Sequence, residues 1–298
     1  MIRDKSLSSK VMDIIVHMTM IIVVLITLVP VLHVISISFS SSDAVNRGDV
    51  TLWPVEFSVQ AYKIIWNAGT VPNSFMNSVK YTALGTVINV IMTIMLAYPL
   101  SKKDLTFRPF YTILIMITMF FGGGLIPSFL LVKNLNLYDT VWAITLPGAI
   151  STWNMIIMRT FFQSIPYELE ESALLDGAND FQVLFKIVIP LSMASIATIS
   201  LFYAVGHWNS WFGPMIYFKR AKDHPLQVIL RAIVIENQMA DELLEQGQAA
   251  AAEEMSRAVT SNSIKYATLV ISMAPMMLIY PFIQKYFVKG VMIGSIKG

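Results

Sequence analysis

The sequence predicts an all-α, polytopic membrane protein with six transmembrane helices. Of its 298 residues 55% are hydrophobic and only 13% are charged, about half the charged share of a soluble domain. The apolar runs decide the class, because a helix needs roughly 20 mostly apolar residues to cross a bilayer. Six runs without Asp, Glu, Lys or Arg meet or approach that length: 14–37, 81–100, 110–132, 141–158, 187–218 and 266–284.

The first run follows a basic head and could be mistaken for a secretion signal. Its apolar core is longer than a signal's, and residues 36–42 offer no convincing cleavage site, so we interpret it as a retained first helix. The third run contains Gly122-Gly123-Gly124, which indicates helix flexibility or close packing. The fifth run is longer than one span, so part of it should lie at an interface or in a bend.

Orientation follows from Lys and Arg, which concentrate in short cytoplasmic connections. The basic residues of the head, the second connection and the tail place both termini in the cytoplasm. We therefore predict a cytoplasmic N-terminus at 1–13, a six-helix domain at 14–286 and a cytoplasmic tail at 287–298. The connections 38–80 and 219–265 would then lie outside, and the connection 163–190 in the cytoplasm.

The connection 163–190 is predicted to form two short helices at a turn. Pro166 suits a first helical turn, and the carboxylates that follow complement the positive end of a helix. Gly177 can end the first helix in the left-handed conformation, and Asn179 or Asp180 can cap the second.

Apolar residues recur at helical spacing in both predicted helices: Leu169, Ala173 and Leu174 in the first, and Phe181, Leu184, Phe185 and Val188 in the second. Such an amphipathic hairpin can seat in a groove of a soluble partner. Alternatively, it could cap the helix bundle or lie along lipid headgroups. Its five carboxylates would repel phosphates, which argues against a nucleic-acid partner.

A family resemblance becomes specific in this connection. Glu171-Ser172-Ala173, Gly177 after three residues, and Ile187-x-Ile189-Pro190 after nine more resemble the EAA loop of binding-protein-dependent ABC importer permeases. Ser172 replaces the usual second Ala, and Ile189 the usual Leu. Asp176-Gly177-Ala178 with Pro190-Leu191 is similar to the carbohydrate-uptake, MalG-like branch.

In that family the loop is the coupling helix, which docks into a cleft of the nucleotide-binding subunit. The positions that would carry ATPase coupling here are Glu170, Glu171, Ser172, Ala173, Asp176, Gly177, Ala178, Phe181 and Pro190. The tail 288–298 resembles that of the same branch, and details near it are similar to importers of polysaccharide-derived oligosaccharides.

The resemblance implies a multi-pass permease of a bacterial cell membrane that translocates a carbohydrate, in particular an oligosaccharide, by alternating access. The implied partners are a second, homologous permease in a heterodimer, two ATP-binding subunits, an extracytoplasmic solute-binding protein and membrane lipid. ATP and Mg would be bound by the ATPase subunits, and no cofactor by this chain.

The residues themselves give no reason to expect an enzyme. The sequence has no G-x-x-x-x-G-K-[ST] pattern, so ATP hydrolysis would have to come from another chain. Its four histidines share no metal-ligand spacing, cysteine is absent, and no Ser, His and carboxylate set converges. We therefore predict neither catalytic nor metal-binding residues.

The substrate path is the least determined part. Sugar recognition favours amides and aromatic faces, which makes candidates of Trp153, Asn154, Trp208, Asn209 and Trp211. The alternative is that the amides join helices and the tryptophans mark interfaces.

Two other function classes stay open. One is a secondary transporter driven by an ion gradient, although ionisable residues in the six runs are limited to three histidines. The other is a membrane scaffold without transport function. A helix-compatible run at 236–259 could dock the binding protein or could simply be solvated.

Overall fold

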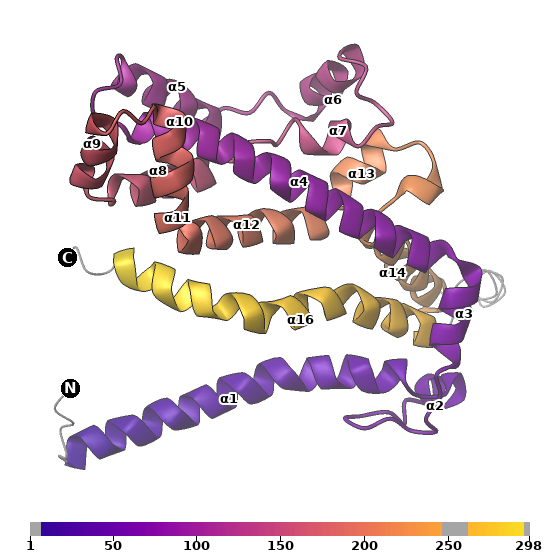
Figure 1. Cartoon of the computed structure of the whole chain (residues 1–298). Coiled ribbons are helices and arrows are strands. Elements are labelled where there is room, and N and C mark those ends of the chain that lie inside the picture. The colour runs from indigo at the N-terminus through magenta and orange to yellow at the C-terminus, as the bar shows by residue number, and fades with distance from the viewer. Residues whose placement is uncertain (1–6, 246–261, 295–298) are drawn as a thin grey trace. The chain divides into compact units, whose positions relative to one another are not determined.

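The computed structural model describes residues 7–245 and 262–294, and every regular element in these ranges is a helix. The all-α prediction is therefore confirmed for the described part of the chain. Figure 1 labels the helices. Their bounds are α1 (Leu7–Ser38), α2 (Ser42–Arg47), α3 (Gln60–Ala68), α4 (Thr70–Ser101), α5 (Arg108–Phe120), α6 (Leu125–Asn134), α7 (Trp142–Thr145), α8 (Thr152–Gln163), α9 (Tyr167–Leu175), α10 (Asp180–Val183), a π-helical turn (Leu184–Val188), α11 (Ile189–Leu191), α12 (Met193–Trp208), α13 (Phe212–Tyr217), a 3-10 turn (Ala221–Asp223), α14 (Leu226–Glu245) and α16 (Asn262–Gly294).

The chain divides into two compact units, Met1–Pro72 with Leu230–Met273 and Asn73–Ile229 with Ala274–Gly298. In the first unit, nearly all large apolar side chains of α1 from Val11 to Leu32 are 39–67% exposed, with Val31 partly buried. A helix that is hydrophobic all round belongs in lipid or against another apolar surface. The chain after α1 folds back on the end of that helix, where the Ser36 hydroxyl donates to the Leu52 carbonyl at 2.7 Å.

Three helices are long and apolar enough to cross a membrane, namely α1, α4 and α16. Two further pairs reach that length only if each bent pair counts as one span: α5 with α6, bent by 113°, and the α10–α11 segment with α12, bent by 83°. By length and composition, the described residues therefore hold three spans, or up to five. The prediction of six spans is not confirmed at this level.

The differences from the predicted runs have local causes. Run 110–132 is interrupted at Gly122–Gly124, where Gly124 has φ +81° before α6 begins. Run 141–158 is interrupted between α7 and α8 at Pro147 and Gly148, neither of which favours a helix interior. The bend expected in the long fifth run is present at the start of α12.

The core of the second unit joins α4, α8, the α10–α11 segment and α12. Its buried side chains include Tyr98 from α4, Met158 and Phe162 from α8, Leu184 from the π-helical turn and Ile199 from α12. The second arm of the predicted hairpin is thus packed against α4, α8 and α12.

The predicted run at 236–259 is only partly within the described residues. Helix α14 starts earlier, at Leu226, and is described as far as Glu245. Residues 246–261, which include most of this predicted segment, lie outside the described part, as do the last four residues of the predicted tail.

Candidate functional site

The predicted two-helix hairpin (the hairpin, residues 163–190) is present. Pro166 precedes α9, and Gly177 follows it with φ +86°, in the left-handed region. The Ala178 N–H donates to the Ala173 carbonyl at 2.9 Å and the Gly177 N–H to the Leu174 carbonyl at 3.0 Å. These two bonds form a Schellman motif, which satisfies carbonyls at the end of α9.

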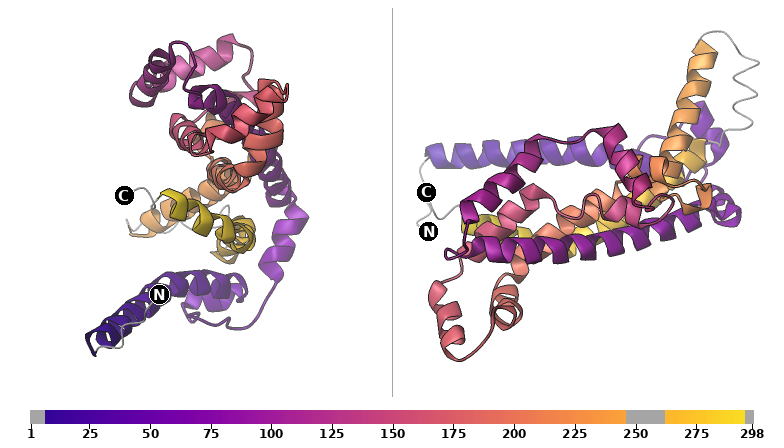
Figure 2. Two further views of the ribbon diagram at one scale, coloured as in Figure 1. Left: turned by 60° about the vertical axis from the view of Figure 1, so that its left-hand side comes forward. Right: turned by 90° about the horizontal axis from the view of Figure 1, so that it is seen from above.

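The second arm starts with a capping box. The Asn179 side chain accepts from the Gln182 N–H at 2.9 Å, and the Gln182 side chain accepts from the Asn179 N–H at 3.0 Å. The reciprocal pair satisfies two backbone donors that α10 leaves open. Figure 2 (right) shows the two arms standing out from the other helices of the second unit.

The hairpin exposes a set of large apolar side chains: Leu169, Leu174, Leu175, Phe181 and Phe185. Leu175, at the end of α9, is 83% exposed. The predicted apolar face of the second arm is divided, because Phe181 and Phe185 point outward whereas Leu184 and Val188 are buried. Residues four apart share a helix face, which explains why these two pairs separate.

Four predicted coupling residues line one shallow groove between the arms. Ser172, Ala173 and Asp176 from the first arm and Pro190 from the second border a cavity of about 460 Å³. Lys186 lies in the same wall. The spacing of the motif thus brings distant positions onto one surface.

The remaining predicted coupling residues divide between the outside and the inside of the hairpin. Glu171, Gly177 and Phe181 are exposed, and Ala178 is half-buried in the turn. Glu170 is only 6% exposed, so its carboxylate does not belong to the outward face. The sequence did not reveal this inward position.

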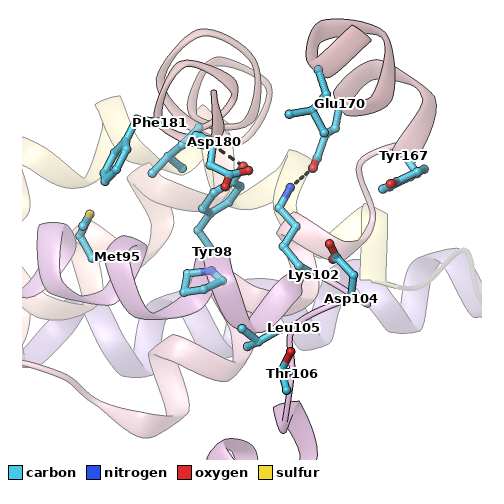
Figure 3. Close-up of a pocket in the computed structure, with 13 residues that line it drawn as sticks. Met95, Tyr98, Lys102, Asp104, Leu105, Thr106, Tyr167, Glu170, Asp180 and Phe181 are labelled. Carbon is cyan, nitrogen blue, oxygen red and sulfur yellow. Dashed lines mark hydrogen bonds and ion pairs between the residues drawn. The ribbon is translucent and has the colours of Figure 1, made fainter. Parts of the chain in front are cut away.

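Glu170 points into a second cavity, of about 500 Å³, between the hairpin and the end of α4 (Figure 3). There it forms an ion pair with Lys102, and their side chains are 8% and 21% exposed. The Lys102 amine also lies over the Tyr98 ring, 4.3 Å from its centroid. Burial lowers the pKa of Lys102, and the nearby carboxylates of Asp180 and Asp104 counteract that shift.

A polar network connects α4 to the interruption between α7 and α8. Asn89 donates to the Gly148 carbonyl at 2.6 Å, and its oxygen lies 2.7 Å from His207 Nε2. The Tyr203 hydroxyl accepts from the Ser151 N–H at 3.0 Å. Side chains thereby satisfy backbone groups that a broken helix leaves open, as a membrane interior requires. Polar residues within apolar runs were the only signal of this network.

The substrate-path candidates occupy two segments with different environments. At the start of α8, Trp153 is 60% exposed whereas Asn154 is buried. At the end of α12, Trp208 is 3% exposed and packs edge-on against Phe75, with ring centroids 5.7 Å apart. Asn209, one residue on, is exposed.

The last of the five candidates, Trp211, is half-buried and lies edge-on to Phe212. Of the five candidates, Trp208 is the one whose burial and ring contact indicate a packing role.

Comparison with known proteins identifies the family of this chain. Residues 85–293 match the family described as "Binding-protein-dependent transport system inner membrane component". The chain belongs to this family. The match includes the hairpin, the polar network and both bent helix pairs of the permease.

The permease resembles two curated proteins of Bacillus subtilis (strain 168) over most of their length. It is 41% identical to the "Polygalacturonan/rhamnogalacturonan transport system permease protein YtcP" over 98% of this chain and 100% of that protein. It is 39% identical to "Protein LplC" over 92% of this chain and 90% of that one.

A solved structure shows the same fold. Its title is "Crystal structure of a bacterial ABC transporter involved in the import of the acidic polysaccharide alginate". The permease aligns with one of its chains with a TM-score of 0.83 and 33% identity, over 96% of this chain and 99% of that chain.

Proposed function

We propose that this permease is one of two membrane subunits of an ABC importer for oligosaccharides released from polysaccharides. A solute-binding protein would deliver the sugar from outside, and two ATP-binding subunits would supply the energy. The names of the related proteins support a carbohydrate: one names polygalacturonan and rhamnogalacturonan, and the solved structure concerns import of the acidic polysaccharide alginate. Acidic oligosaccharides are therefore the first substrates to test.

The observation that carries the proposal is the outward face of the hairpin. Leu175 is 83% exposed at the end of α9, and Leu169, which lines the groove together with the motif residues, is 44% exposed. Exposed apolar side chains on a short, capped hairpin fit a cleft on another protein. The docked partner would be the ATPase subunit, with its ATP and Mg.

The topology proposed for the permease has six membrane crossings and both termini in the cytoplasmic compartment of a bacterial cell. The third to fifth crossings would be bent or interrupted at Gly124, Gly148 and the start of α12. Interrupted helices are compatible with a membrane where neighbouring side chains satisfy the free backbone groups, and Asn89 and Tyr203 do so here.

Transport would follow alternating access. Closure of the two ATPases would displace the hairpin, and the helices anchored to it would open the pathway to the other side of the membrane. Of the predicted path residues, Asn154 is the first to test. Its amide is buried within the second unit, where an amide has a strong need for a polar partner.

The test is reconstitution of the full complex in liposomes with its binding protein inside or outside. We expect ATP-dependent uptake of acidic oligosaccharides, with neutral oligosaccharides of equal length as the comparison. Uptake that follows an ion gradient and ignores ATP would refute the proposal. Uptake of neutral sugars alone would refute only the substrate class. Replacement Asn154→Ala should slow uptake, and an unchanged rate would remove Asn154 from the path.

A further inference from the structure

The last turn of α4 and the residue after it hold both arms of the hairpin. Lys102 pairs with Glu170 of α9, and the Tyr98 hydroxyl donates to the Asp180 carbonyl at the start of α10, at 3.3 Å. Tyr98 and Lys102 are four residues apart, so both side chains leave the same face of the helix. Figure 3 shows them converging on the cavity between α4 and the hairpin.

The contact with α9 is fixed rather than loose. The Glu170 side chain is 8% exposed, and removing one partner of a buried pair leaves the other charge uncompensated. An exposed pair would instead contribute little. The Lys102 amine is also held over the Tyr98 ring, and that ring packs edge-on against Phe162 at 6.5 Å.

From this attachment α4 extends without interruption to the polar network. Asn89 of the network stands nine residues before Tyr98 in α4, which corresponds to about 14 Å at 1.5 Å per residue. Asn89 donates to the Gly148 carbonyl in the interruption between α7 and α8. A displacement of the hairpin would therefore be carried along α4 to the interruption between α7 and α8.

We propose that Lys102 and Glu170 are positioning residues that transmit movement of the hairpin to α4. The inference rests on the proposed function only in that the hairpin receives this movement from an ATPase. Neither residue contacts the sugar or the nucleotide in this account. Their role is to keep α9 and α4 moving together.

The first test measures ATPase activity of the purified complex with and without sugar-loaded binding protein. Lys102→Met and Glu170→Gln should each reduce the fold stimulation by about fivefold or more, and Lys102→Met should retain basal hydrolysis. The double variant should be no worse than the poorer single variant, since both remove the same contact. Lys102→Arg should keep stimulation, and so should the control Lys103→Met, because Lys103 is exposed.

Two results would overturn the proposal. One is near-normal stimulation in both single variants, or effects that simply add in the double variant. The other is that the ATPase subunit no longer co-purifies with the Lys102→Met permease but does with Lys102→Arg. The pair would then only shape the surface on which the ATPase docks. Absence of any ATPase from the unmodified complex would instead refute the proposed function.

A second test does not depend on ATP. The chain has no cysteine, so one spin-label pair can be placed at the exposed positions Val87 on α4 and Glu168 on α9. In the full complex, Lys102→Met should broaden the distance distribution between these labels, and Lys103→Met should not. An unchanged distribution in Lys102→Met would contradict the link even if coupling were lost.

Discussion

Substitutions of Gly177, in the turn of the hairpin, should act through backbone strain and not through a steric clash. Gly177 has φ +86°, and a Cβ at this position would meet nothing within 4 Å. Replacement with Ala or Val would therefore act through the left-handed backbone alone. That conformation costs an L-residue about 1–2 kcal/mol, and a β-branched side chain more.

This cost shifts the population of the native turn by about five- to thirtyfold. We expect Gly177→Val to abolish most of the stimulation of ATPase activity by sugar-loaded binding protein, and Gly177→Ala to lower it less. Gly177→Asn should retain the most, because Asn tolerates the left-handed region. Membrane insertion and basal ATPase activity should stay near normal in all three.

A matched control is available outside the hairpin. Gly69 follows α3 with φ +73° and likewise has open space around a Cβ, so Gly69→Val carries a similar backbone cost. The assay is ATP hydrolysis and sugar uptake by the complex in liposomes. Normal stimulation in Gly177→Val, or an equal loss in Gly69→Val, would refute the reasoning.

Three further predictions concern packing and charge. A Cβ at Gly85 would lie 2.4 Å from His207 Nε2, so Gly85→Ala should destabilise the complex by about 1–3 kcal/mol. Adding His207→Ala to the Gly85→Ala variant should raise its thermal-unfolding midpoint again. If the midpoint stays low, the clash is not the cause. Tyr203→Phe leaves the Ser151 N–H without its acceptor and should cost about 1–3 kcal/mol; an unchanged midpoint would argue against the contact. Hydrogen bonds from a serine hydroxyl and then an arginine lower the pKa of Glu56. The ionised Glu56 therefore contributes to the stability of the fold above the ordinary pKa range of glutamate, and this contribution is lost as the pH falls below about 4.3. Amide exchange in residues 41–56, corrected for intrinsic rates, should accelerate as the pH falls through this range. In Glu56→Gln the corrected rates should not change with pH in this range.

The local structure of the hairpin could be predicted from the sequence because its determinants are neighbours in the chain. Pro166, Gly177 and Asn179 each fix a backbone position with their own chemistry. Gly177 follows α9 as expected and Asn179 is the cap of α10, whereas Pro166 stands one residue before α9 rather than in its first turn. The length of the fifth run predicted either an interfacial segment or a bend, and the structure has a bend.

The interruptions were harder to predict, because hydropathy averages over the residues that break a helix. Gly122–Gly124 and Pro147 were visible in the sequence, but a run of apolar residues around them still has the composition of one span. Whether a neighbour satisfies the freed backbone groups decides the outcome. That neighbour, Asn89 for the Gly148 carbonyl, belongs to a distant segment.

The inward position of Glu170 could not be predicted for the same reason. In sequence it is one of several carboxylates at the start of α9, all equally compatible with a solvated helix end. Only the fold brings Lys102 to it. The predicted coupling residues therefore include a group that faces outward and one that faces α4, and a motif pattern alone does not separate them.

Photocrosslinking from the tip of the hairpin tests the central claim most directly. A photoreactive residue at Leu175, the most exposed apolar position of the hairpin, should capture the ATP-binding subunit in native membranes. The same residue at Val87 on α4 should not. Capture of the extracytoplasmic binding protein at Leu175, or equal capture of the ATPase from both positions, would contradict the account.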